Sequence, residues 1–226
     1  MRRIPTIFIT AALTLVLPLA ALPSSAWASD NDVDKVNGSV KVDAGQQAGN
    51  VSSINGSVHV GDGATVQKAS TVNGSVDLGD KAQANELETV NGAVTMGTSS
   101  RVGGEVTAVN GSLRLAQGAE VTGKLSNVNG AIALDAAHVA GGIGTVNGDI
   151  TIGANSHVEG GILVEKPNDG WFHWGSSRDP LIVIGPHAVV QGTLDFRREV
   201  VLKVSDSAQI GPVKGATVVR FSGATP

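Results

Sequence analysis

The five histidines are the side chains of this sequence best suited to hold a metal or to transfer a proton. They are His59, His138, His157, His173 and His187. His138 and His157 each precede a valine, and in the stacked coils predicted below they would lie outside on neighbouring coils, about 4.8 Å apart. Two imidazoles at that distance can bind a metal, but no third column of ligands accompanies them. We therefore predict neither a metal site nor a cofactor.

Other catalytic constellations do not occur in this sequence. The chain has no cysteine, which excludes disulfides, zinc held by thiolates and cysteine nucleophiles. Its acidic residues are scattered rather than paired, and it has neither a phosphate-cradling Gly-Lys-Ser/Thr motif nor a Gly-x-Ser-x-Gly nucleophile motif. We predict no catalytic residue and a non-enzymatic protein that acts as a structural, self-associating or interaction scaffold of the cell envelope. The alternative is an envelope protein that binds or acts on polysaccharide.

Aromatic side chains gather in one segment, residues 165–180, which is rich in turn residues and is predicted to be a loop. Trp171, Phe172 and Trp174 are three of the five aromatics that follow residue 28, and Arg178 lies close by. Exposed aromatics with polar neighbours are typical of contact sites for a partner protein or a sugar polymer. We predict a contact loop made of Trp171, Phe172, Trp174 and Arg178. The alternative is that the two tryptophans fold back as a clamp over an adjacent coil.

The first 28 residues have the pattern of a secretory signal peptide. Two arginines precede an apolar run over residues 7–22, and Ala26-Trp27-Ala28 is a small-x-small cleavage site. A membrane anchor is the alternative, but Pro18 and Pro23 interrupt the run, and no later stretch is suited to span a bilayer. We predict export to the periplasm or the cell exterior, with a mature chain of 198 residues that begins at Ser29.

Charge and composition exclude two classes of partner and favour a repeat. Removal of Arg2 and Arg3 leaves 14 of the 16 basic residues against all 20 acidic ones, a net charge of −6 that favours neither nucleic acid nor anionic lipid. The whole chain is 41% apolar but only 3% aromatic, and it has 30 glycines. Such a composition indicates thin layers stacked regularly.

A Val/Ile-Asn-Gly triplet recurs along the sequence at intervals of 18 or 19 residues. Its asparagines are Asn37, Asn55, Asn73, Asn91, Asn110, Asn129 and Asn147. Within one unit the apolar positions 72, 76, 78, 82 and 84 alternate between steps of four and two, and the next unit begins at position 90. This pattern fits short strands joined by two-residue corners and not a helix. Glycines fill these corners at residues 56, 61, 74, 79, 97 and 153, where we expect positive φ angles.

These patterns predict an all-β fold, a three-sided parallel β-solenoid with coils of about 18 residues. Seven regular coils would cover residues 36–164 after an acidic segment, 29–35, and two looser coils with an end cap would fill residues 181–226. We expect the seven asparagines to form a ladder of buried amides that fixes the register. From the second triplet onward, the residues that precede the triplets would form an outward stripe of small and fairly uniform side chains: Ser53, Thr71, Thr89, Ala108, Asn127 and Thr145.

Two families share these sequence features. Six-residue units such as Val60-Gly61-Asp62-Gly63-Ala64-Thr65 and Ile152-Gly153-Ala154-Asn155-Ser156-His157 resemble the hexapeptide repeat of left-handed β-helix acyltransferases and γ-class carbonic anhydrases. The coil length, the glycine punctuation and the stretch over residues 184–192 are more similar to bactofilins, over about residues 36–215. The latter resemblance implies a right-handed solenoid that polymerises through its ends without nucleotide. Bactofilins are typically cytoplasmic and lack the segment 165–180, so a cytoskeletal role is not implied for an exported chain.

Overall fold

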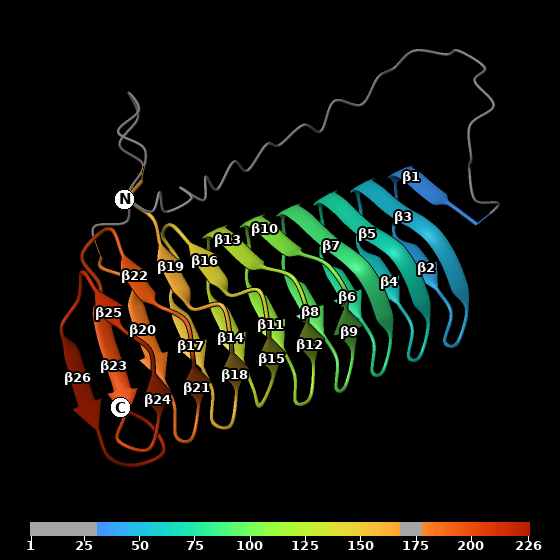
Figure 1. The fold of residues 1–226 in the computed structure, drawn as a ribbon. Coiled ribbons are helices and arrows are strands. Elements are labelled where there is room, and N and C mark those ends of the chain that lie inside the picture. The colour runs from blue at the N-terminus through green and yellow to red at the C-terminus, as the bar shows by residue number, and fades with distance from the viewer. Residues whose placement is uncertain (1–30, 168–177) are drawn as a thin grey trace, which may run out of the picture.

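The chain winds into a rod of stacked coils, with the first coil at one end and the last at the other (Figure 1). The computed structural model describes residues 31–167 and 178–226, and these residues contain strands but no helix. Strands pair in parallel with the equivalent strand one coil away, for example β4 with β6 through Val58 and Val76. The predicted parallel β-solenoid is confirmed.

One side of the rod is a sheet of ten short strands, one from each coil, which we call the ten-strand sheet. In order these strands are β2 (Val40–Val42), β4 (Val58–Val60), β6 (Val76–Leu78), β8 (Val94–Met96), β11 (Leu113–Leu115), β14 (Ile132–Leu134), β17 (Ile150–Ile152), β20 (Leu181–Ile184), β23 (Val201–Ser205) and β26 (Val218–Phe221). The continuation through β20, β23 and β26 shows that the solenoid resumes after residue 180.

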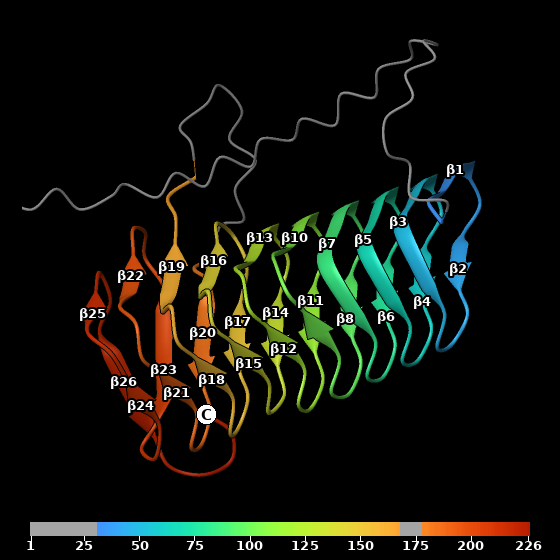
Figure 2. The ribbon, with the colours of Figure 1, turned by 45° about the vertical axis from the view of Figure 1, so that its right-hand side comes forward.

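The remaining strands form a second sheet that divides into two arms (Figure 2). It begins with β1 (Val33–Asn37) and three nine-residue strands, β3 (Gln47–Asn55), β5 (Thr65–Asn73) and β7 (Gln83–Asn91). From β7 one arm continues through β9 (Arg101–Val102), β12 (Glu120–Val121), β15 (His138–Val139), β18 (His157–Val158), β21 (Val189–Val190) and β24 (Gln209–Ile210). The other continues through β10 (Val106–Asn110), β13 (Leu125–Asn129), β16 (Ile143–Thr145), β19 (Ile162–Val164), β22 (Leu194–Phe196) and β25 (Val213–Lys214).

An added residue accounts for both the division into arms and the change in repeat length. Gln83 pairs with Arg101 and Asn91 with Asn110, so nine residues of β7 face ten residues of the next coil. The extra residue lies at the pair Gly103–Gly104, between the two short strands β9 and β10. The spacing of the triplets therefore rises from 18 to 19 at this coil. From this coil onward, each coil contains three separate strands.

The interior is filled by valine, leucine, isoleucine and alanine, but part of the predicted pattern is out of phase. Val66 is buried as expected, whereas Val72 points outward and is half-buried. Ala69 and Thr71 lie inside instead. Pairing is interrupted at Gln67, so that the alternation of inward and outward side chains restarts one residue later than a regular pattern predicts.

The predicted corner glycines are required for a different reason from the one expected. None of the six has a positive φ; a left-handed backbone occurs further along the corner, at residues such as Gly63 and Lys81. A Cβ on Gly61 would lie 2.6 Å from the backbone nitrogen of Ala44, and one on Gly74 would overlap the carbonyl oxygen of Gly56. Glycine is needed because successive coils approach closely at these corners.

Candidate functional site

The seven triplet asparagines stack in one column along a corner of the rod. From Asn55 onward, each Nδ2 donates to Oδ1 of the asparagine one coil earlier, at distances of 2.9–3.1 Å. The side chains lie at the outer surface, exposed from Asn37 to Asn129 and half-buried at Asn147. The stacking agrees with the sequence-based expectation, but the expectation of buried amides is wrong. From Asn37 to Asn129 each asparagine is the last residue of its strand and follows an outward-facing residue, where the chain turns at the surface.

The ladder ends beside the inserted segment. Oδ1 of Asn147 accepts a hydrogen bond from Nη1 of Arg198 at 2.6 Å, and the same nitrogen lies 3.2 Å from the carbonyl oxygen of Val146. Thr145 pairs with Val164, so the next coil has Glu165 and not a Val-Asn-Gly triplet after this position. Arg198 therefore supplies the donor that a further asparagine would have given. The sequence pattern gave no signal for this arginine, because it lies outside the repeat.

Both ends of the segment 165–180 are attached to the coils by ion pairs. On the leaving side, the Glu165 carboxylate accepts two hydrogen bonds from Nη1 of Arg197, at 2.8 and 2.9 Å. On the returning side, the Asp149 carboxylate accepts one from Nη2 of Arg178 at 2.6 Å and one from the backbone nitrogen of Leu181 at 2.8 Å. The base of the segment is thus fixed by side chains from three different coils.

The predicted contact residues divide into two groups. Trp171, Phe172 and Trp174 lie outside the described residues. Arg178 is paired with Asp149, yet 72% of its side chain is exposed to solvent. Arg178 therefore has a positioning contact as well as an open surface for a partner.

A second hydrogen-bonded column runs inside the same corner, where an outward stripe was expected. Ser53, Thr71, Thr89 and Asn127 are 0–4% exposed. Each donates from its side chain to a glycine carbonyl of the preceding coil: Gly38, Gly56, Gly74 and Gly111, at 2.6–3.0 Å. The outward stripe is therefore wrong, because the phase shift at Gln67 turns these residues inward. Their role is to satisfy carbonyl groups of the corner turns.

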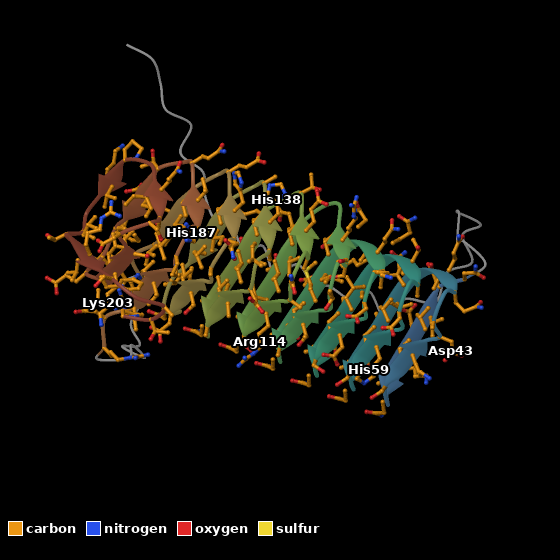
Figure 3. The ribbon with its side chains drawn as sticks, turned by 90° about the horizontal axis from the view of Figure 1, so that it is seen from below. Asp43, His59, Arg114, His138, His187 and Lys203 are labelled. Atoms are coloured by element: carbon orange, nitrogen blue, oxygen red, sulfur yellow. The ribbon has the colours of Figure 1, made fainter. Side chains whose placement is uncertain are left out.

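His138 and His157 are neighbours, as their spacing predicts. They pair in register on β15 and β18, with ring centroids 5.4 Å apart. Nε2 of His138 lies 2.9 Å from a Glu159 oxygen, and Nε2 of His157 lies 2.9 Å from the Gln191 amide nitrogen. Across residues 31–167 and 178–226, no group of three or more histidine, aspartate or glutamate side chains is arranged to hold a metal ion. His59 lies on the opposite long side of the rod from His138 (Figure 3).

A charged cluster occupies the outer face of β5 and β7. Nζ of Lys68 lies 2.8 Å from carboxylate oxygens of both Glu86 and Glu88. Partial burial lowers the pKa of Lys68, but the hydrogen bonds and charges of the two glutamates outweigh that effect and raise it above its ordinary value of 10.5. The cluster thereby links two successive coils and holds a cation between two anions.

An open groove of about 330 Å³ follows the outer surface where β7 gives way to β9 and β12. The amide side chains of Gln67, Gln83 and Asn85 line it together with Arg101. Among the described residues these three amides have no hydrogen-bonding partner, in contrast to the amides of the ladder. Free amides around a hollow are suited to polar partners, since each offers a donor and an acceptor.

Comparison of the chain with protein-family models, curated proteins and solved structures gave no match. The resemblance to bactofilins therefore stays a prediction from the sequence. In the described part of the chain, no helix is long and apolar enough to cross a membrane.

Proposed function

We propose that the protein is an exported, non-catalytic β-solenoid that acts as an interaction scaffold of the cell envelope. In this role the coils form a stiff support, and the segment 165–180 is the contact surface. The observation that carries the proposal is the attachment of this segment at both ends, by Glu165 to Arg197 and by Arg178 to Asp149. Both ends of the segment are thus held against the coils.

The way in which the repeats use their polar side chains also supports a scaffold. The ladder amides bond to one another, and the inner hydroxyl groups bond to glycine carbonyls. The carboxylates at the base of the segment, Glu165 and Asp149, are engaged with arginines. These groups hold coils together, and residues used in this way are not placed for proton transfer to a substrate. The amide-lined groove is a second surface open to a polar partner.

Export is the other half of the proposal, and it depends on the predicted signal peptide. We expect a chain with a C-terminal tag to be recovered outside the cytoplasm, with Ser29 as its first residue by N-terminal sequencing. Recovery of the tagged chain in the cytoplasm with residues 1–28 intact would contradict export.

Binding to envelopes tests the contact surface. The mature chain should bind isolated envelopes of the producing cells, and the double variant Trp171→Ala/Trp174→Ala should lose that binding while its unfolding temperature stays the same. The double variant Lys41→Ala/Arg114→Ala, which alters exposed residues of the ten-strand sheet, is the matched control and should bind normally. Unchanged binding by the tryptophan variant, or loss of stability without loss of binding, would favour a clamp and contradict the proposal.

The chemistry of the partner can be read in the same assay. Periodate destroys the vicinal diols of sugars, whereas protease treatment removes protein. Loss of binding only after periodate would assign a polysaccharide partner, and loss only after protease would assign a protein partner.

A further inference from the structure

The two ends of the rod are where a second copy would stack. Among the described strands, β1 pairs only with β3 and β2 only with β4 at one end, while β26 pairs only with β23 at the other (Figure 1). An unpaired edge of parallel strands above an apolar interior is a template for further pairing. The residues that occupy inward positions of the two terminal coils therefore decide whether copies join.

At the first coil, a lysine occupies an inward position. Lys35 pairs in register with Ser53, a member of the buried inner column. Its Nζ donates to the carbonyl oxygen of Ser39 at 2.8 Å. One coil later, the equivalent carbonyl of Ser57 accepts the backbone amide of Val40 from the preceding coil, at 2.9 Å. Lys35 thus supplies the donor that a preceding coil would supply.

At the last coil, an arginine occupies an inward position. It pairs with Val204 and ends a column whose nine earlier members are all buried and apolar: Val42, Val60, Leu78, Met96, Leu115, Leu134, Ile152, Ile184 and Val204. The residue is Arg220, and its Nη1 donates to the carbonyl oxygen of Ser205 at 2.9 Å. The last turn is therefore covered by a guanidinium group and not by another coil.

Both terminal cations would become buried if one copy stacked on another. A head-to-tail junction joins the last coil of one chain to the first coil of the next, so that Arg220 and Lys35 enter the same junction. The buried polar residues of the described chain are serine, threonine and asparagine, and they include no carboxylate that could neutralise either cation. Burying an unpaired charge is strongly unfavourable.

We propose that Lys35 and Arg220 are end caps. Each end of the solenoid is a surface on which a second copy of this chain could stack, and one inward cation at each end prevents that stacking. The native protein is accordingly a single rod. End-to-end polymerisation, which the resemblance to bactofilins implies, requires that these two cations be removed. The proposal does not depend on which partner binds the segment 165–180.

Substitution of both caps by the residue types of their own columns tests the proposal. Wild-type mature protein should sediment with the mass of one chain across the micromolar range. The variant Lys35→Thr/Arg220→Val should assemble, with its average mass rising about twofold or more with concentration. The control Lys41→Thr/Arg114→Val removes the same two charge types from the outer face of the ten-strand sheet, and it should remain a single chain.

Mixing the two single variants gives a sharper result and needs no double substitution. The Lys35→Thr chain has an open first coil, and the Arg220→Val chain has an open last coil. Only one junction in the mixture lacks both cations, so the two chains should form a one-to-one dimer that does not grow. Each variant alone should assemble much less than the mixture.

Three results would overturn the proposal. The first is assembly of the wild-type protein itself, and the second is assembly of the outer-face control, which would trace the effect to net charge. The third is a mixture of folded single variants, with β-sheet circular dichroism like the wild type, that stays monomeric at the concentrations used for the double variant.

Discussion

Two hydrogen-bonded columns follow the same corner of this solenoid, two residues apart in each coil, one inside and one outside. The inner column contains serine, threonine, alanine and asparagine, whereas the outer column is asparagine in all seven coils. An inner residue needs only a donor for a glycine carbonyl, and several residue types provide one. An outer residue must accept from one neighbour and donate to the other along the axis, which a side-chain amide does best.

The column with the most uniform sequence is therefore not the column that contributes most to stability. An intramolecular hydrogen bond contributes about 0.5–1.5 kcal/mol net, but a buried group that loses its partner costs about 1–3 kcal/mol. The exposed amides of the ladder can exchange a lost partner for water. The inner hydroxyl groups and the carbonyls they serve have no such replacement. Sequence repetition thus marks the column that sets the register, and burial marks the column that contributes more stability.

The largest expected effect comes from a triplet glycine, Gly74, whose carbonyl oxygen accepts the hydrogen bond of the inner-column residue Thr89. The change Gly74→Ala places a Cβ against the carbonyl oxygen of Gly56 and displaces the carbonyl that Thr89 serves. We expect the free energy of unfolding in urea to fall by about 3 kcal/mol or more, because the new Cβ would overlap a backbone atom, which cannot move aside as a side chain can. Gly45→Ala, at a corner where a Cβ meets no atom within 4 Å, is the comparison. Its positive φ gives a strain of about 1 kcal/mol, so an equal loss at both sites would contradict the close-approach argument.

The next effect separates the inner column from the outer one. Thr89→Val keeps the shape of a fully buried side chain but removes the hydroxyl group that donates to Gly74. We expect a loss of about 1–3 kcal/mol in the free energy of unfolding. Thr89→Ser, which keeps the hydroxyl donor and removes only a methyl group, is the control. If Thr89→Val is neutral, the inner column does not stabilise the coil.

A smaller effect is expected in the outer column. Asn91→Ala removes one rung of the ladder, but the neighbouring amides remain exposed to water. We expect a loss of about 0.5 kcal/mol, and less at the terminal rung Asn37, by thermal or urea unfolding. A loss at Asn91 larger than that of Thr89→Val would reverse the order of the two columns.

Much of the fold could be predicted because the same residue types recur at equivalent positions of each coil. The triplet spacing gives the coil length, and steps of two and four give the strands and corners. The sequence did not show which side chains of the long strands point inward, because the interrupted pairing at Gln67 and Asn85 depends on how the strand curves through space. Because this phase shift is not visible in the sequence, the regular pattern placed Val72 inside and Thr71 outside, and the inner column was missed.

The residues around the inserted segment and the ends show the same limit. Asp149 and Arg178 are separated by an insertion that no repeat aligns, so their pairing required coordinates. The inward position of Lys35 could have been predicted, since it precedes Asn37 by the same two residues that separate Ser53 from Asn55. A lysine in a column of serine and threonine is the sequence signal that identifies an end cap.

The smallest effect concerns the charged cluster on the outer face, where the connection between coils is electrostatic and not made by amides. Because the folded pKa of Lys68 is raised above 10.5, its contribution to stability is fully present below that pH and is lost as pH rises through the higher folded value. At neutral pH we expect the free energy of unfolding of the wild type to exceed that of Lys68→Met by a few tenths of a kcal/mol, as is usual for solvent-accessible ion pairs. The difference should decrease above pH 10.5, vanish once the pH passes the higher folded pKa, and also vanish in high salt. Lys203→Met, at a lysine that has no ion pair within the described residues, is the control. A difference that survives both alkaline pH and salt would mean that Lys68 acts through the packing of its methylene groups across the coils and not through its charge.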